Sequence, residues 1–453
     1  MIEFGKIIFL VSFFGCIIQS LILFGDNADE MLAIPLMLIL GGAGAFFLSR
    51  NSDDEDSGFQ INIFLWAYSL RLWMGMALYG WELSEIFGDE DSSGYVYGWR
   101  MASNWYENGF DGFISDLVFV LFDQQNVGQA LIWAIPTFFA GGESRMIVSV
   151  VNSLAGAMLV IVVFRMTRRV FDSQTARISA VLVTFWPSNI LLSATTAKEM
   201  LVIFFEWMVL YLLIRTPRGL SVRDGLLAIP FFISVFITRF YAIYMLAAAA
   251  LFRFLVASRR NIMRNMVFGS AIVLSVLIFL NAGGMMNRDF ERLERLQGQV
   301  GTWREGMART TGSGVEIYSE AESTTVAIPI ATVYFFLAPF PWEVFSGTAR
   351  NAFGAIENIF IIVILIIGFP AIKIVFKDRF VEMAPVFVFC ALYAGMHIWG
   401  LSNIGLAWRH KQTIMPLLFI LVAVGITQRR AGLDLLAGRL RKGRTDHKFI
   451  PVK

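Results

Sequence analysis

The chain has 453 residues, of which 57% belong to the hydrophobic set and only 16% are charged. Soluble globular proteins are about 45–50% apolar and about 25% charged, so this composition excludes a soluble enzyme with one hydrophobic core, and it also excludes a disordered chain. The net charge of +2 excludes a nucleic-acid binder, and the two cysteines, Cys16 and Cys390, make neither a disulfide framework nor a metal cluster.

Apolar segments of about 20 residues recur along the chain and predict membrane-spanning helices, because a helix of that length satisfies its own backbone across the hydrocarbon. The predicted spans are 6–25, 31–49, 60–81, 144–166, 175–194, 198–214, 225–240, 241–257, 264–282, 355–374, 382–400 and 411–428. The pair covering 225–257 is short for two full spans, so broken or tilted helices are expected there. Prolines interrupt two weaker segments, 127–140 and 324–342, and whether these cross the membrane stays open. The predicted fold class is an all-α, polytopic transmembrane helical bundle of about 11–13 spans.

Lysine and arginine in short loops predict the orientation, because such loops stay on the cytoplasmic side. Basic loops occur at Arg165–Arg177, Arg215–Arg223, Arg253–Arg264 and Lys373–Arg379. The N-terminus is then inside, and the outer regions are 82–143, 283–354 and 401–410. Within the second of these, 324–342 is expected to be an amphipathic helix on the outer surface. Residues 1–428 form one predicted transmembrane domain, and 429–453 form a cytoplasmic basic tail that attracts anionic lipid.

Three consecutive carboxylates, Asp89, Glu90 and Asp91, follow a predicted span and precede a segment whose aromatic residues, from Tyr95 onward, fall on one side of a helix. The triplet could be a solvated loop end. A carboxylate at a membrane-embedded helix start is also well placed to act as a base, because burial and cationic neighbours tune its proton affinity. Asp89 and Asp91 could instead hold a divalent cation through hard oxygen ligands.

A second polar cluster, Trp408-Arg409-His410-Lys411, opens the last predicted span on the outer side, against the positive-inside trend. One interpretation is that these long side chains snorkel at a helix end. The other is an anion site, since arginine offers paired donors to phosphate, lysine a point charge and histidine a switchable donor. His397, in the preceding span, is more typical of a core histidine.

Ionisable residues also occur at Lys198 and Glu199, at the outer end of the predicted hairpin 175–214, and at Arg239, between two apolar half-segments. Adjacent residues do not share a helix face, so Lys198 and Glu199 are expected to have separate partners. An ionisable residue at the depth of Arg239 is a functional candidate, or else the structural partner of an acid such as Glu199.

Three stretches together resemble the polytopic GT-C fold glycosyltransferases of family 39. The first is Asp91-Ser-Ser-Gly-Tyr95, followed by a juxtamembrane helix to Tyr106 and then Gly109. The second is a central block that contains Gly128, Gly142-Glu-Ser-Arg145, Asn152, Arg168-Arg-Val-Phe171, Ala176, Pro187 and Lys198-Glu199. The third is Trp408-Arg-His-Lys-Gln-Thr-Ile-Met-Pro416. The family places its acidic motif just after the first span, whereas here it follows three, so two additional N-terminal helices are implied.

The resemblance implies transfer of a sugar from a polyprenyl-phosphate donor to a saccharide, lipid or protein acceptor on the outer face of the plasma membrane, most typically a bacterial inner membrane. Asp91 would be the general base, with Asp89 or Glu90 orienting the acceptor or a divalent cation. Arg409, His410 and Lys411 would neutralise the lipid phosphate. Tyr95, Lys198, Glu199 and Arg239 would line the substrate cavity. Such a transferase uses no nucleotide, and the resemblance implies no certain cofactor.

Two other functions compete with this hypothesis. An O-antigen-type polymerase or ligase would carry arginine and histidine in a large outer loop, but 283–323 has five arginines and no histidine. A lipid-linked saccharide flippase or other transporter would favour two-fold repeats, which the sequence lacks. The absence of G-x-x-x-x-G-K-[ST], H-E-x-x-H and G-x-S-x-G disfavours an ATP motor, a zinc protease and a serine hydrolase.

Overall fold

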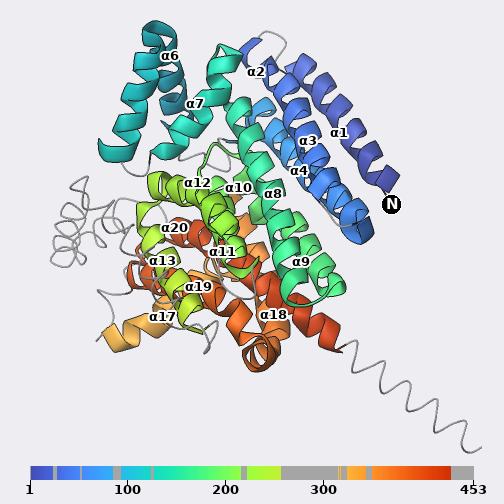
Figure 1. The fold of residues 1–453 in the computed structure, drawn as a ribbon, viewed down its shortest axis with the longest axis vertical. Helices are drawn as coiled ribbons and strands as arrows, with labels where there is room; N and C mark the ends of the chain where they lie inside the picture. Colours follow the sequence, from blue (N-terminus) through green and yellow to red (C-terminus); the bar gives the residue numbers. More distant parts are fainter. Residues whose placement is uncertain are drawn as a thin grey trace, which may run out of the picture.

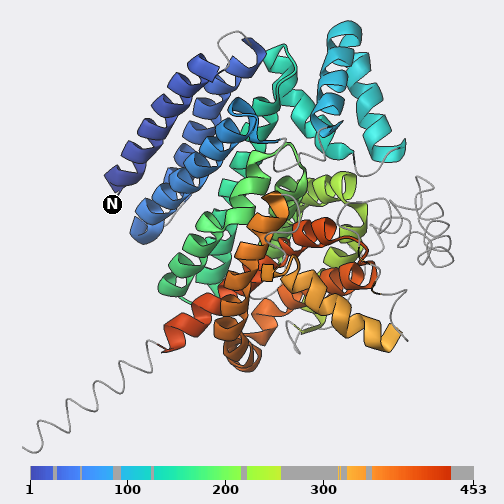
Figure 2. The same cartoon turned by 180° about the vertical axis from the view of Figure 1, so that it is seen from behind.

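The computed structural model describes residues 2–23, 28–51, 54–84, 93–123, 127–215, 222–256, 315, 317, 324–342 and 349–429. Within these ranges the regular elements are helices and no strand forms, which confirms the predicted all-α class. Figure 1 and Figure 2 show the helices from opposite sides. The predicted span 264–282 and the tail 430–453 lie outside the described residues.

The N-terminal helices pack side by side along one edge of the molecule (Figures 1 and 2). They are α1 (Ile2–Leu23), α3 (Ala33–Asn51) and α4 (Asp54–Gly80), with the short α2 (Ala28–Met31) between α1 and α3. The inner face of α4 contacts the central helix α8 (Arg145–Val170), which also packs against α3, α7, α9, α10 and α11. Helix α8 is apolar on every side, as expected for a helix inside a bundle or a membrane, and its neighbours bury most of its residues.

Polar residues set the ends of the central helices. Ser144 caps the start of α8 by accepting a hydrogen bond from the backbone N–H of Ile147 at 3.1 Å. Asp172 caps α9 (Ser173–Phe185) in the same way, through Thr175 at 2.8 Å. Pro187 then opens α10 (Pro187–Ala194), so that α9 and α10 meet at a 55° bend. These caps satisfy backbone groups that a helix terminus leaves without partners.

The segment 93–123, in the region predicted to lie on the outer side, forms a helical hairpin rather than one helix. Element α6 (Ser93–Val118) is interrupted at Gly109, whose φ of 58° is accessible to glycine and strained for other residues. Its two arms are joined where Asn104 and Trp105 both donate to one Asp116 oxygen, at 3.1 and 2.8 Å. The expected amphipathic helix is present, with Trp105 on its buried side. A π-helical turn, η1 (Phe119–Asp123), leads to α7 (Gly128–Ala140), which packs on α6 and α8.

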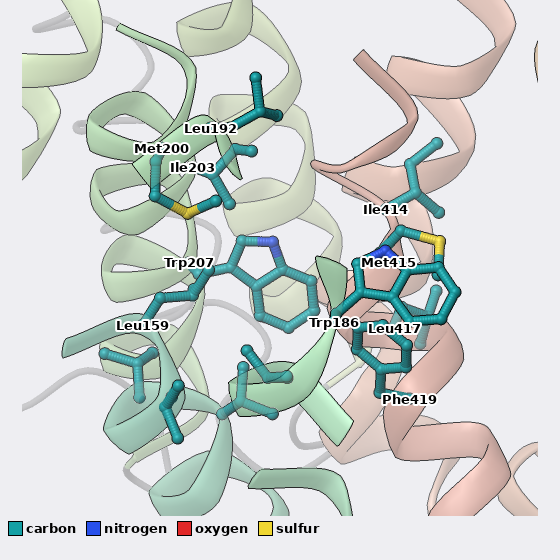
Figure 3. Packing of buried hydrophobic residues seen from close by; sticks show 14 of the residues in the cluster. Leu159, Trp186, Leu192, Met200, Ile203, Trp207, Ile414, Met415, Leu417 and Phe419 are labelled. Carbon is teal, nitrogen blue, oxygen red and sulfur yellow. The ribbon is translucent and has the colours of Figure 1, made fainter. Parts of the chain in front are cut away.

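The remaining helices form the other half of the molecule. They are α11 (Glu199–Arg215), α12 (Val222–Thr238), α13 (Phe240–Val256), α17 (Thr324–Leu337), α18 (Ala349–Asp378), α19 (Phe380–Trp399), α20 (Ile404–Lys411) and a last helix, Met415–Arg429. The break expected within 225–257 is confirmed, because Arg239 separates α12 from α13. Figure 3 shows how Trp207 of α11 and Trp186 face Met415 and Phe419 of the last helix, which joins the two halves through apolar packing.

Five described helices are long and apolar enough to cross a membrane: Asp29–Asn51, Asp56–Gly80, Arg145–Val170, Ala352–Asp378 and Phe380–Trp399. Counting α9 with α10, and α20 with Met415–Arg429, as single bent spans raises the number to seven. The expected number was about 11–13. The described residues give fewer, since α11, α12 and α13 have 17 residues each, at the lower limit for a crossing, and the predicted span 264–282 lies outside them. The segments left open, 127–140 and 324–342, form α7 and α17, which at 13 and 14 residues are short for a crossing of about 20 residues.

The Val170 end of α8 is held by a buried acid. Asp56, at the start of α4, is 1% exposed and pairs with Arg168 at 2.9 Å and Arg177 at 2.7 Å. Ser173 adds a hydrogen bond to the same carboxylate at 2.9 Å. The basic turn predicted between these two helices is therefore partly neutralised, and it fixes α4 against both α8 and α9.

We expect Asp56→Asn to destabilise the protein by about 1–3 kcal/mol, because two arginines then share a neutral amide. The measurement is the unfolding temperature of the purified protein in detergent, followed by tryptophan fluorescence. The exposed Asp111 supplies the control, since Asp111→Asn should change stability by no more than about 0.5 kcal/mol. Equal unfolding temperatures for the two variants would contradict the structural role of Asp56.

Candidate functional site

Arg239 lies inside the molecule, at the one-residue break between α12 and α13, and is only 3% exposed. Its Nη1 atom donates to the hydroxyl of Tyr393 at 2.7 Å and lies 3.5 Å from Thr413 Oγ1. The same atom is 3.5 Å from Oε1 of Glu206, which forms an ion pair rather than a close hydrogen bond. Glu199 was the acid expected to pair with Arg239. The ion pair is formed instead by Glu206, another glutamate two turns further along the same helix.

Helix α20 carries the predicted basic cluster and begins at Asn403, whose side chain accepts from the backbone N–H of Leu406 at 3.2 Å. Successive residues on a helix point about 100° apart, so a run of four covers its whole circumference. Each member of Trp408–Lys411 accordingly reaches a different set of neighbours. The cluster is one segment in sequence but not one surface in space.

Arg409 is the most exposed of the three cations, with 15% of its side chain accessible. Its Nη1 atom lies 3.4 Å from Oε1 of Glu199, the first residue of α11. The pair joins the last part of the chain to the central block across 210 positions. It is a charged pair at the edge of the buried core.

His410 points into the core instead. Its Nδ1 atom is 2.7 Å from the Tyr393 hydroxyl, and its ring lies 3.8 Å from that of His397, centroid to centroid. His397 is 2.9 Å from the backbone oxygen of Tyr393 through Nδ1 and 3.4 Å from the Tyr241 hydroxyl through Nε2. The two histidines and two tyrosines form a continuous polar chain within an apolar surrounding.

Lys411 is buried, at 1% exposure, on the side of α20 that faces α18 and the end of α17. Its ammonium donates to Asn358 Oδ1 at 2.5 Å and to the backbone oxygens of Ala338 and Phe336 at 3.3 and 3.4 Å. Trp408 donates to Glu357 at 3.3 Å, and the same carboxylate accepts from the backbone N–H and the hydroxyl of Ser188. Trp408 and Lys411 therefore anchor α20 to α18.

Lys198 and Glu199 follow a turn that the central helix holds in place. Asn152 of α8 donates to the backbone oxygens of Thr195 and Ala197, both at 2.9 Å. Trp133 of α7 in turn donates to the Asn152 side-chain oxygen at 3.2 Å. Glu199 is placed by α8, at the start of a helix, where a carboxylate interacts favourably with the helix dipole.

Tyr95 lies close to the start of α8. Arg145 donates to its hydroxyl at 3.3 Å and stacks over its ring, with 5.1 Å between the guanidinium carbon and the ring centroid. The same helix start is capped by Glu30 of α2, which accepts from the backbone N–H groups of Arg145 and Met146 and from the Ser144 hydroxyl at 2.6 Å. Helix α6 is thereby connected to the Arg145 end of α8.

Asp89, Glu90 and Asp91, the candidate base and cation ligands, lie outside the described residues, between Ser84 and Ser93. In the described part of the chain no group of three or more His, Cys, Asp or Glu could hold a metal ion. The role of Asp91 as general base therefore stays a prediction.

The structure brings Glu199 next to Arg409, and Lys198 directly precedes Glu199 in the sequence. Tyr95 lies at the start of α8, where it contacts Arg145. It separates Arg409 from Arg239, His410 and Lys411, which lie deeper. Sequence reasoning missed Glu206, Tyr393 and Glu357, and it named Asn152 only as part of the central block, without a role. For Glu206 and Glu357 a signal existed, because each is an acid within an otherwise apolar helix. Tyr393 gives no such signal, since tyrosine is common in helices of this kind.

Residues 126–282 match the family described as dolichyl-phosphate-mannose-protein mannosyltransferase, over about a third of the chain. A search of curated proteins finds no match. The family match confirms the expected resemblance to polytopic membrane glycosyltransferases that use a lipid-phosphate-linked sugar. The matched stretch contains α7, α8, Glu199, Glu206 and Arg239.

Lys411 and Arg409 should respond differently to the same substitution. We expect Lys411→Met to destabilise the protein by about 2–4 kcal/mol, because it leaves buried oxygens without a donor. Arg409→Met should cost less than Lys411→Met, because Arg409 keeps 15% of its side chain exposed, although the change removes a partner of the buried Glu199. Unfolding temperatures in detergent test the contrast, and a loss of stability as large for Arg409→Met as for Lys411→Met would refute it.

Proposed function

We propose that this polytopic membrane glycosyltransferase moves a sugar, mannose being the first candidate, from a polyprenyl-phosphate donor to an acceptor hydroxyl on the outer face of the membrane. Asp91 acts as the general base, and Arg409 contacts the donor phosphate. The observation that carries the proposal is the ion pair between Glu199 and Arg409, which follows the turn that Asn152 of α8 holds, seven residues along that helix from the contact with Tyr95.

A series of contacts along α8 links Tyr95 to Glu199 and Arg409, which supports a single shared site. Tyr95, four positions after Asp91, contacts Arg145 at the helix start. Asn152 lies seven residues further, about 10 Å along the axis, and holds the turn that leads to Glu199. Arg409 follows through its ion pair with Glu199. The three stretches that resemble the transferase family in sequence are therefore linked within about two helical turns.

The proposed reaction is a single displacement at the anomeric carbon. The acceptor hydroxyl gives its proton to the Asp91 carboxylate while its oxygen forms the new bond to carbon. The bond between that carbon and the phosphate oxygen breaks, and the electron pair leaves with the polyprenyl phosphate. The charge that grows on the leaving phosphate is stabilised by a positioned guanidinium, and attack from the opposite side inverts the configuration.

Direct contact with the phosphate is assigned to Arg409 rather than to the whole basic cluster. His410 and Lys411 are buried and have protein partners on α19, α18 and the end of α17. They support the helix that carries Arg409. The placement of this site on the outer face agrees with the basic turn at the opposite end of α8, because basic loops favour the cytoplasm.

Asp91→Asn tests the base. We expect transfer from radiolabelled polyprenyl-phosphate mannose, with a membrane envelope fraction as acceptor, to fall about 10²–10⁴-fold while donor binding is unchanged. Asp89→Asn and Glu90→Gln are compared with it and should lose less transfer, because an acid that orients the acceptor contributes less than the base. If Asp91→Asn stays active and one of the other two variants does not, the base is the neighbouring acid. If all three variants keep full transfer, the acidic motif is not catalytic.

Arg409→Ala tests the phosphate contact. Loss of a charge-assisted hydrogen bond should raise the donor KM or Kd about 10-fold or more, while the acceptor KM stays the same. Arg379→Ala is the control, because Arg379 is an exposed arginine that pairs only loosely with Glu382, at 3.8 Å. Unchanged donor affinity in Arg409→Ala would overturn the role of this residue.

A further inference from the structure

We propose that Arg239 is a positioning residue for Arg409: it aligns the donor-phosphate contact from inside the protein through Tyr393 and the bend after α20. This inference rests on the proposed function of Arg409. Arg239 was expected to line the substrate cavity. Because its side chain is buried, it cannot do so, and a positioning role replaces that expectation.

The surroundings of Arg239 exclude direct contact with substrate. The residue is 3% exposed, and its Nη1 atom is already surrounded by Tyr393, Thr413 and Glu206. A guanidinium placed among apolar helices is costly without such partners, so a residue of this kind is retained for what it holds together. Its three partners come from α19, from the turn after α20, and from α11.

The first connection to Arg409 runs through Tyr393. Arginine can only donate, so the hydrogen bond at 2.7 Å uses the oxygen of the Tyr393 hydroxyl as acceptor. The hydroxyl hydrogen is then available for Nδ1 of His410, also at 2.7 Å. A neutral His410 consequently carries its own hydrogen on Nε2. Arg239 thus donates to Tyr393, and Tyr393 donates to His410, the residue that follows Arg409.

The second connection runs through the bend. Residues 412–414 join α20 to Met415–Arg429 at an angle of 54°. Arg239 lies 3.5 Å from Thr413 Oγ1, and Trp207 donates to the Thr413 backbone oxygen at 2.9 Å. Trp207 occupies the centre of the packing between α11 and the last helix in Figure 3. Arg239 therefore contacts, through Thr413, the turn that begins three residues after Arg409.

The third connection is electrostatic. Glu199 and Glu206 are seven residues apart on α11, so they lie on the same face of that helix, two turns apart. Glu206 pairs with Arg239 at 3.5 Å, and Glu199 pairs with Arg409 at 3.4 Å. Because Arg239 compensates the charge of Glu206, Glu199 remains to orient Arg409. Removal of Arg239 would leave Glu206 as an uncompensated charge close to this pair.

A double-mutant cycle separates positioning from a general structural role. The measured quantity is the Kd of the purified, full-length protein for polyprenyl-phosphate mannose in nanodiscs, together with kcat for transfer. Arg239→Lys keeps the charge but loses the planar donor geometry, and Tyr393→Phe removes only the relaying hydroxyl. We expect each to weaken donor binding about 5–10-fold, with the acceptor KM unchanged.

The decisive variant is the double substitution. If Arg239 acts through Arg409, Arg239→Lys combined with Arg409→Ala should bind donor within about 2-fold of Arg409→Ala alone. Arg71 provides the matched control, because it is equally buried but bonds to Ser193 and Ala67, away from α19 and α20. Arg71→Lys should leave the Kd unchanged even where it lowers the unfolding temperature.

The outcomes distinguish this inference from the function on which it rests. If Arg409→Ala leaves donor binding intact, the proposed phosphate contact is wrong, and the positioning role of Arg239 fails with it. If Arg409→Ala weakens binding but the effects of Arg239→Lys and Arg409→Ala multiply, only the positioning role is refuted. Should Arg239→Lys fail to fold, the same cycle is read from Tyr393→Phe and Arg409→Ala.

Discussion

A buried arginine imposes the strongest constraint on this helical bundle, because a guanidinium among apolar helices must find oxygen partners close to it. Arg239 finds them on three elements that are far apart in the sequence: Glu206 of α11, Tyr393 of α19 and Thr413 after α20. The positions of these helices relative to one another are consequently coupled. The pair of Glu199 and Arg409 is built on this framework, at its more accessible edge.

The central helix α8 is fixed by an acid at each end, and both acids come from the N-terminal helices. Glu30 of α2 accepts hydrogen bonds from the helix start, and Asp56 of α4 pairs with Arg168 and with Arg177 of the next helix. The N-terminal helices that precede the acidic motif are thus part of the main body rather than an appendage. They hold the helix from which Asn152 and Arg145 organise the candidate site.

Much of the architecture could be predicted from the pattern of apolar residues. The all-helical bundle, the break at Arg239 and the amphipathic helix after Tyr95 each follow from local sequence, since they depend on residues close together in the chain. The ends of the helices could not, because α11, α12 and α13 stop at 17 residues each, the lower limit for a crossing, and a hydropathy pattern does not state where such helices end. Sequence also identified Glu199 and Arg409 as candidates, on the strength of their charge in an apolar region.

The sequence by itself determined the membrane class, the helical fold and the kinds of side chain available for chemistry, because hydrophobicity and charge are properties of single residues. Only the tertiary structure decided that Arg409 lies at an accessible edge while His410 and Lys411 are buried. Consecutive residues of a helix diverge by about 100°, so their neighbours depend on which helices surround them. Those neighbours come from positions as far as 210 residues away, and no local pattern contains that information.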